Sequence, residues 1–166
     1  YVYFSDLTEL LLALFEPVMA DADAMYMGKL VTFWPDETLE ADCLSFVTSY
    51  FDFWSKHTQL LHLRHSMAEA GSRRMVKHRV ESAQPMVGLI AAQMEHDPDE
   101  HRTPALGMAT VLFMGLDRMV AVTTHQVLPH VVEGRFRPHI ENFLKAEARL
   151  FYHGIMDYRR IARGEA

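Results

Sequence analysis

Residues 6–27 read DLTELLLALFEPVMADADAMYM, and the apolar side chains in this stretch return every three or four positions. That spacing places them on one face of an α-helix, whereas a strand would alternate them between two faces. Asp6 can cap the helix, and Glu9 stands three residues further on, as in a capping box. Pro17 removes a backbone donor inside the helix, so we expect a bend there.

The same period recurs along the rest of the chain, and valine, isoleucine and threonine are not gathered in alternating runs. Gly71 is a natural C-cap, while Ser72 and Thr103 can serve as N-caps. Breaks are expected at residues 28–35 and in the loop at 96–99. The sequence therefore predicts an all-α domain of six main helices, the later ones at about 36–56, 58–71, 73–94, 103–126 and 138–162.

Composition narrows the class of protein. The chain has 166 residues, of which 49% are apolar, so it is long enough for one domain with a core of its own. Cys43 is the single cysteine, which excludes a disulfide framework and favours a reducing cytosol. No signal peptide is visible, and runs such as residues 10–15 are too short to span a bilayer. We expect a cytoplasmic protein without membrane contacts.

Net charge argues against DNA binding by these residues alone. The formal charge is −6 with histidines neutral. Affinity for DNA comes largely from cationic contacts to phosphate, so any DNA-binding module would have to lie outside this stretch.

The start of the chain and a run of residues in its middle carry a resemblance to a known family. The start, Tyr1-Val2-Tyr3-Phe4 followed by a capped helix, resembles the junction between the DNA-reading helix of a tetracycline-repressor-like (TetR-like) transcriptional regulator and its next long helix. Residues 50–57 (YFDFWSKH), the leucines at 60–61, residues 67–71 (MAEAG) and Arg79 resemble a run found in one branch of the family's sensor domains. The resemblance covers the whole chain. It implies that residues 1–5 end a truncated helix-turn-helix domain and that residues 6–166 form a ligand-binding and dimerisation domain.

The resemblance also implies roles for the first aromatic residues. In such families the first tyrosine of the motif often touches a DNA phosphate, which would be Tyr1 here and, less directly, Tyr3. The family often has a lysine after the helix cap, and this chain has Leu7 there, which puts one phosphate contact in doubt. The alternative is that both tyrosines are ordinary aromatic residues at a helix end.

A ligand pocket among helices is mostly apolar with a few polar anchors. Eleven methionines suggest an adaptable cavity for a small lipophilic or aromatic ligand. The alternative is that aromatic residues at helical spacing form plain core. The apolar candidates for the lining are Phe15, Met19, Phe46, Tyr50, Phe53, Trp54, Leu61, Val87, Phe113 and Met114, and the polar candidates are His62, His65, Gln84 and Asp117.

Ten histidines raise the possibility of a metal or haem protein as a rival function. His62 and His65 lie three apart on a helix, but the chain has no His-Glu-x-x-His arrangement and no second cysteine. Neither a nucleophile–base set nor a glycine-rich phosphate loop can be placed. We therefore expect no metal, no cofactor and no enzymatic activity.

The last two predicted helices carry more apolar surface than one domain needs, which favours a dimer interface. The resemblance implies that they pair as a four-helix bundle about a two-fold axis; the alternative is that they only close the core of the monomer. The predicted interface residues are Leu116, Val120, Ile140, Phe143, Leu144, Phe151 and Ile155. The leading hypothesis is a homodimeric, ligand-responsive regulator, expected to be a repressor, that binds operator DNA only as the full-length protein. A ligand-free helical dimerisation module is the other alternative.

Overall fold

The computed structural model describes residues 4–94, 103–131 and 139–165, and every regular element in these ranges is a helix. The prediction of an all-α fold with six main helices is confirmed. The predicted loop at 96–99 lies outside the described residues. The long helices are α1 (Leu7–Ala22), α3 (Leu39–Lys56), α4 (Thr58–Glu69), α5 (Arg73–Ala92), α6 (Pro104–Thr123) and α8 (Ile140–Ala162), and the short ones are α2 (Gly28–Val31) and α7 (Leu128–Val131).

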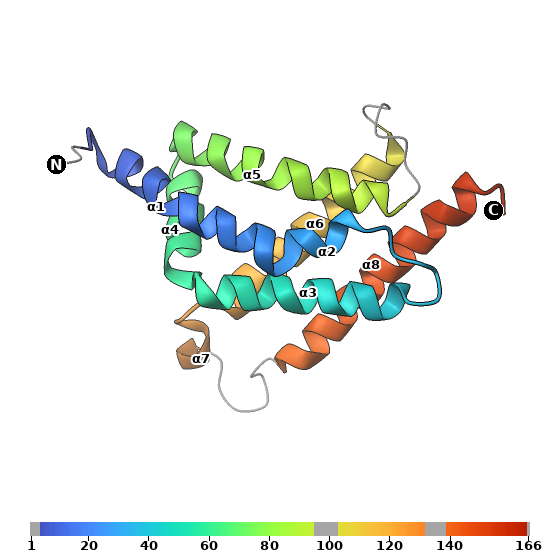
Figure 1. Ribbon diagram of the computed structural model, residues 1–166. Helices are drawn as coiled ribbons and strands as arrows, with labels where there is room; N and C mark the ends of the chain where they lie inside the picture. Colours follow the sequence, from blue (N-terminus) through green and yellow to red (C-terminus); the bar gives the residue numbers. More distant parts are fainter. Residues whose placement is uncertain (1–3, 95–102, 132–138, 166) are drawn as a thin grey trace.

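The helices form two layers (Figure 1). In the view of Figure 1, α1 and α2 run between α5 and α3 in front, while α6 and α8 lie behind them. Between the elements, α3 packs against α8, α5 packs against α4 and α6, and α6 packs against α8. The apolar core therefore lies between the layers, with Phe15, Phe46, Trp54 and Phe151 fully buried in it.

The start of α1 is fixed by side-chain capping, as the sequence predicts. The Asp6 carboxylate accepts a hydrogen bond from the Glu9 backbone N–H at 2.8 Å. The Glu9 carboxylate in turn accepts from the backbone N–H of Ser5 at 2.6 Å, one residue before the expected partner. The first bond satisfies a backbone donor that the first turn of the helix leaves open, and the second fixes the residue that precedes the cap.

The predicted break at residues 28–35 begins too early. After α1 the chain forms a π-helical segment (Asp23–Met27) and then α2, so Gly28 lies inside the helical run with φ −57°. The helix ends at Thr32, whose backbone is extended. Continuing through Gly28 carries Leu30 into the core, where it is 1% exposed, and this burial outweighs the weak helix propensity of glycine.

Side chains satisfy the backbone groups that this helix end leaves open. The Trp34 indole Nε1 donates to the Lys29 carbonyl at 2.8 Å. The buried Gln93 side chain, just after α5, accepts from the Trp34 N–H at 2.9 Å and donates to the Leu30 carbonyl at 2.9 Å and the Thr32 carbonyl at 3.1 Å. The end of α5 is thereby joined to the segment that follows α2.

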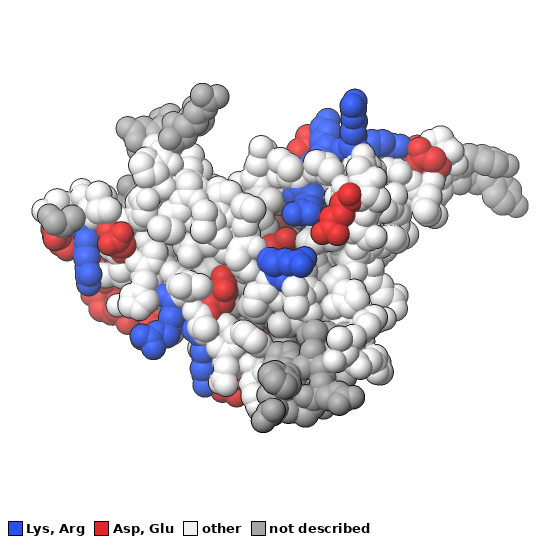
Figure 2. All heavy atoms as spheres, turned by 180° about the vertical axis from the view of Figure 1, so that it is seen from behind, with Lys and Arg blue, Asp and Glu red and all other residues white. Residues whose placement is uncertain are grey.

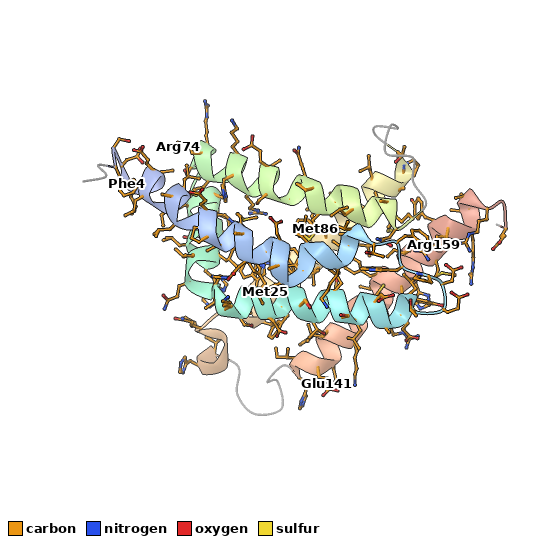
Figure 3. All side chains as sticks on the ribbon, viewed as in Figure 1. Phe4, Met25, Arg74, Met86, Glu141 and Arg159 are labelled. Carbon is orange, nitrogen blue, oxygen red and sulfur yellow. The ribbon has the colours of Figure 1, made fainter. Side chains whose placement is uncertain are left out.

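Arg159 of α8 completes this junction, beside the segment between α2 and α3 (Figure 3). Its side chain is fully buried, with Nε donating to the Gln93 carbonyl at 2.7 Å and Nη1 to Asp36 Oδ1 at 2.6 Å. The guanidinium also lies 4.2 Å from the ring centroid of Phe33. Arg163 bonds Asp36 Oδ2 at 2.6 Å. Hydrogen bonds from Arg163 and Arg159 lower the pKa of Asp36 to about 2.

The remaining helix ends mostly follow the prediction. The bend at residues 56–58 separates α3 from α4, and Gly71 ends the α4 turn in the left-handed region with φ +90°. Thr103 caps α6 by accepting from the Leu106 N–H at 3.3 Å. Ser72 occupies the N-cap position of α5, but its side chain makes no capping bond there.

The apolar helix α6 buries only part of its surface within the chain. Ala109, Leu116 and Val120 are fully buried, whereas Val111 is 65% and Met114 61% exposed. Part of the apolar surface of α6 is therefore left uncovered within one chain. Among the described residues, α6 is also the one helix long and apolar enough to cross a bilayer, a test that the core helix of a globular protein passes too.

Candidate ligand-binding cavity

A cavity of about 420 Å³ lies among α1, the π-helical segment, α3, α4, α5 and α6. This volume is within the range of small-molecule sites in proteins. Helices α5 and α6 supply its longest walls, and their lining residues recur at helical spacing, such as Gln84, Val87 and Gly88 on α5 and Leu106, Thr110 and Phe113 on α6. One face of each helix therefore looks onto the same space.

The exposure of the lining residues shows where the cavity opens. Tyr50, Phe53, Leu61 and Met86 are buried and form its floor, and Figure 3 shows Met86 between α5 and the run of α1 and α2. In contrast, Val80, Gln84 and Gly88 on α5, and Thr110 and Met114 on α6, are exposed. The mouth thus lies between α5 and α6.

A polar group from α6 lies within these apolar walls. The Asp117 carboxylate accepts a hydrogen bond from the Tyr50 hydroxyl at 2.8 Å. Burial raises the pKa of the Tyr50 hydroxyl well above its usual range, so it stays protonated and acts as a donor. His65 Nε2 lies 3.6 Å from Asp117 Oδ2, too far for a hydrogen bond. Burial lowers the pKa of His65 to about 4, so the ring is neutral near pH 7 and the contact is not an ion pair.

Arg64 on α4 is the most deeply buried cation on the cavity wall, with 6% of its surface exposed. Its Nη1 donates to the Ser82 hydroxyl of α5 at 3.2 Å, and its guanidinium lies 5.5 Å from the centroid of the Phe15 ring. Among the described residues, no protein group accepts a hydrogen bond from its Nε. Arg79 of α5 also lines the cavity and adds a second guanidinium nearby.

The structure brings most of the sequence-predicted pocket residues to this one cavity. The predicted residues that line the cavity are Met19, Tyr50, Phe53, Gln84, Val87, Phe113, Met114 and Asp117. Leu61 lines it as well, whereas Phe46 is fully buried away from it.

Besides Phe46, four other expected residues do not line this cavity. Phe15 and Trp54 are fully buried and pack as core, Phe15 against His78 and Trp54 against the rings of His62 and His65. Those two histidines face a surface hollow between α4 and α6 instead. The helical spacing predicts which residues share a face of a helix, but it does not show which neighbouring element that face packs against.

Sequence reasoning missed the arginines and one tyrosine. Arg64 and Arg79 look like surface cations in a sequence, because burial of a long charged side chain depends on tertiary packing. Tyr26 lines the cavity from the π-helical segment, whose extra residue per turn changes the direction of its side chains relative to an α-helix. Only for Arg79 did the sequence give a signal, because this residue belongs to the run that resembles the sensor domains of the TetR-like family.

The predicted dimer residues divide into two groups. Leu116, Val120, Phe151 and Ile155 are fully buried inside the single chain and are not available to a partner, which corrects their assignment. Phe143 is 43% exposed, and Ile140 and Leu144 are partly buried. The sequence did not single out Leu150, which is exposed beside a groove between α6 and α8.

The histidines make local contacts. His62 Nε2 lies 3.2 Å from the Thr124 hydroxyl, and its ring packs edge-on against that of His125. Within the described ranges, no group of three or more His, Cys, Asp or Glu side chains could hold a metal ion. Tyr1 and Tyr3, the expected DNA contacts, lie outside the described residues.

No family model, curated protein or solved structure matches the chain. Function is therefore inferred from the sequence and from the geometry of the cavity.

Proposed function

We propose that this chain is the ligand-sensing and dimerising domain of a TetR-like transcriptional regulator, most simply a repressor. The observation that carries the proposal is the cavity of about 420 Å³ with an apolar floor and a mouth between α5 and α6. A ligand-free dimerisation module has no use for such a space, so the cavity favours a sensor.

Helix α1 is the element through which an occupied cavity would signal. Met19 of α1 and Tyr26 of the π-helical segment both lie on the cavity wall, and Pro17 stands in the same helix. A ligand that displaces these side chains shifts α1, and with it whatever precedes α1 in a regulator. The net charge of −6 means that a basic module outside these residues would make the DNA contacts.

The ligand site is tested with a neutral fluorescent probe, N-phenyl-1-naphthylamine, titrated into the purified chain. We expect one probe to bind per chain, and Ala83→Trp, which places an indole on the cavity wall, to weaken binding about tenfold or more. Ala92→Trp, at an exposed position on the same helix, is the matched control. Equal affinity of the wild type and Ala83→Trp would remove the cavity from the proposal.

The regulatory step is tested in a protein that carries the DNA-binding module. Because linkage is reciprocal, the bound ligand weakens operator binding by the same factor by which operator weakens ligand binding. The measurement is the dissociation constant of the probe with and without an operator duplex selected from random sequences. An unchanged constant would separate the cavity from transcriptional control.

The proposed dimer uses the outer face of α6 and α8. Uncharged side chains make up most of the face seen in Figure 2, which is the side on which α6 and α8 lie. Exposed apolar residues on these helices include Val111, Phe143 and Leu150. A two-fold pairing of this surface would match a palindromic operator.

Light scattering of Phe143→Asp tests the interface, and we expect a monomer. The control is Leu63→Asp on α4, because Leu63 is 39% exposed and Phe143 is 43% exposed. A dimer that survives the change at Phe143 but dissociates with the change at Leu63 would place the interface on α4.

A further inference from the structure

The cavity wall carries an excess of positive charge. Its ionisable side chains are the guanidinium groups of Arg64 and Arg79, the carboxylate of Asp117 and the phenols of Tyr26 and Tyr50. The phenols are neutral because burial raises the pKa of both. Two cations face one anion, and one positive charge has no counterpart on the wall.

The anion on this wall already has a partner. Asp117 accepts from the Tyr50 hydroxyl at 2.8 Å, and its other oxygen lies 3.6 Å from a neutral His65. The Asp117 carboxylate thus has a hydrogen-bond donor on the wall, and one of the two cations balances its charge.

The two guanidinium groups have more hydrogen-bond donors than acceptors around them. A guanidinium has five N–H donors. Arg64, which is 6% exposed, uses one donor on the Ser82 hydroxyl, and among the described residues its Nε has no acceptor. Neither Arg64 nor Arg79 forms an ion pair with a carboxylate within the described part of the chain. A buried charge without an anion is costly, and a bound anion removes much of that cost.

We propose that the cavity binds a monoanionic amphiphile, whose carboxylate is held by Arg64 and Arg79 and whose apolar body lies against Phe53, Leu61, Met86 and Phe113. This inference rests on the proposed ligand-sensing function and names the chemical class of the ligand. One negative charge balances the wall, and the planar guanidinium fork matches a carboxylate in a bidentate pair. The apolar floor accounts for the rest of the molecule.

Three probes with the same ten-carbon chain test the headgroup: decanoate, decanol and decylammonium. Their dissociation constants are measured by titration calorimetry with the whole chain at pH 7. We expect decanoate to bind about tenfold or more tightly than decanol, and decylammonium to bind least tightly. Tighter binding of decylammonium would assign the headgroup to Asp117 and overturn the inference.

Arg64→Met tests the residue itself, because methionine keeps an unbranched side chain and removes the charge. We expect the variant to bind decanoate about tenfold or more weakly, to bind decanol unchanged, and to melt at the same or a higher temperature than the wild type without ligand. A merely structural arginine would lower the melting temperature and weaken both probes equally. Arg79→Met should weaken decanoate alone as well, and Arg73→Met, at an exposed position on α5, is the matched control.

The outcomes separate this inference from the proposed function. Equal binding of decanoate and decanol to the wild type would overturn the anionic headgroup and leave a neutral ligand site. No binding of any of the three probes, together with no binding of N-phenyl-1-naphthylamine, would overturn both.

Discussion

Replacing Gln93 by leucine should destabilise the fold by much more than a typical surface change. The Gln93 side chain is 1% exposed and makes three hydrogen bonds, to the Trp34 N–H and to the carbonyls of Leu30 and Thr32. Leucine has a similar volume but bonds none of them. The substitution therefore leaves backbone groups unpaired where the end of α5 meets the segment after α2.

The magnitude follows from the burial of each bond. The bonds to Trp34 and Leu30 are buried, whereas the bond to Thr32 is partly buried, so water can replace it. Each buried group without a partner costs about 1–3 kcal/mol, and the added apolar surface of leucine returns about 1 kcal/mol. For the two buried groups together we expect a net loss of about 1–5 kcal/mol in the free energy of unfolding.

Urea denaturation followed by circular dichroism and by tryptophan fluorescence measures this loss, and coincident curves justify a two-state analysis. Gln59→Leu, at an exposed position on α4, should change the free energy by less than about 0.5 kcal/mol. If Gln93→Leu cost no more than this control, the bonds at Gln93 would not be holding the two segments together.

Gln93→Glu sharpens the test because it alters the charge and the donors without changing the shape. The carboxylate can still accept from the Trp34 N–H, but its other oxygen faces the two carbonyls that the amide group had bonded. Burial raises the pKa of such a carboxyl group above its unfolded value. The variant should therefore lose stability as the pH rises above about 4, where glutamate ionises in the unfolded chain, and recover part of it in acid, where the protonated acid regains a donor.

Two further predictions concern other parts of the molecule. The ion pairs that Arg163 and Arg159 make with Asp36 lower its pKa from 3.8 to about 2, so their contribution is fully present above about pH 4 and is lost as the pH falls toward 2. The unfolding free energies of the wild type and Asp36→Asn should therefore converge over that interval, and a gap independent of pH would contradict the pairing. Gly88→Ala should raise stability by up to about 1 kcal/mol in thermal melts, since the added Cβ has no heavy atom within 4 Å beyond its chain neighbours and the backbone of its own helix. At Gly154 the added Cβ would meet a leucine side chain at 3.0 Å, so alanine should be less favourable there, and the opposite order would refute the argument.

Local chemistry explains why much of the fold was predictable from sequence. Asp6 and Thr103 cap helices through bonds between near neighbours, and Gly71 takes a backbone conformation that few other residues adopt easily. At Gly28 such local rules give the wrong prediction. Its propensity predicts a break, but burial of Leu30 further along the helix decides the outcome.

The candidate site was predictable only in part. Sequence spacing shows which residues share one face of a helix, but not which other element packs against that face. Val87 and Phe113 reach the cavity as expected, whereas Trp54 has the same periodic character and packs in the core. The same ambiguity made Leu116 look like an interface residue. Arg64 was missed because only packing of α4 against α5 and α1 gives a long cation an interior position.

The π-helical segment at Asp23–Met27 sets the rotational register between α1 and α2. One residue of an α-helix corresponds to about 100° of rotation about its axis, so converting this wide turn to α-helix would turn one flank against the other by roughly that angle. The α2 flank is held by Trp34 and Gln93, whereas the start of α1 meets α5 through the exposed ion pair of Asp6 and Arg74. Tyr26 lies inside this turn, so such a change of register would begin at the cavity wall.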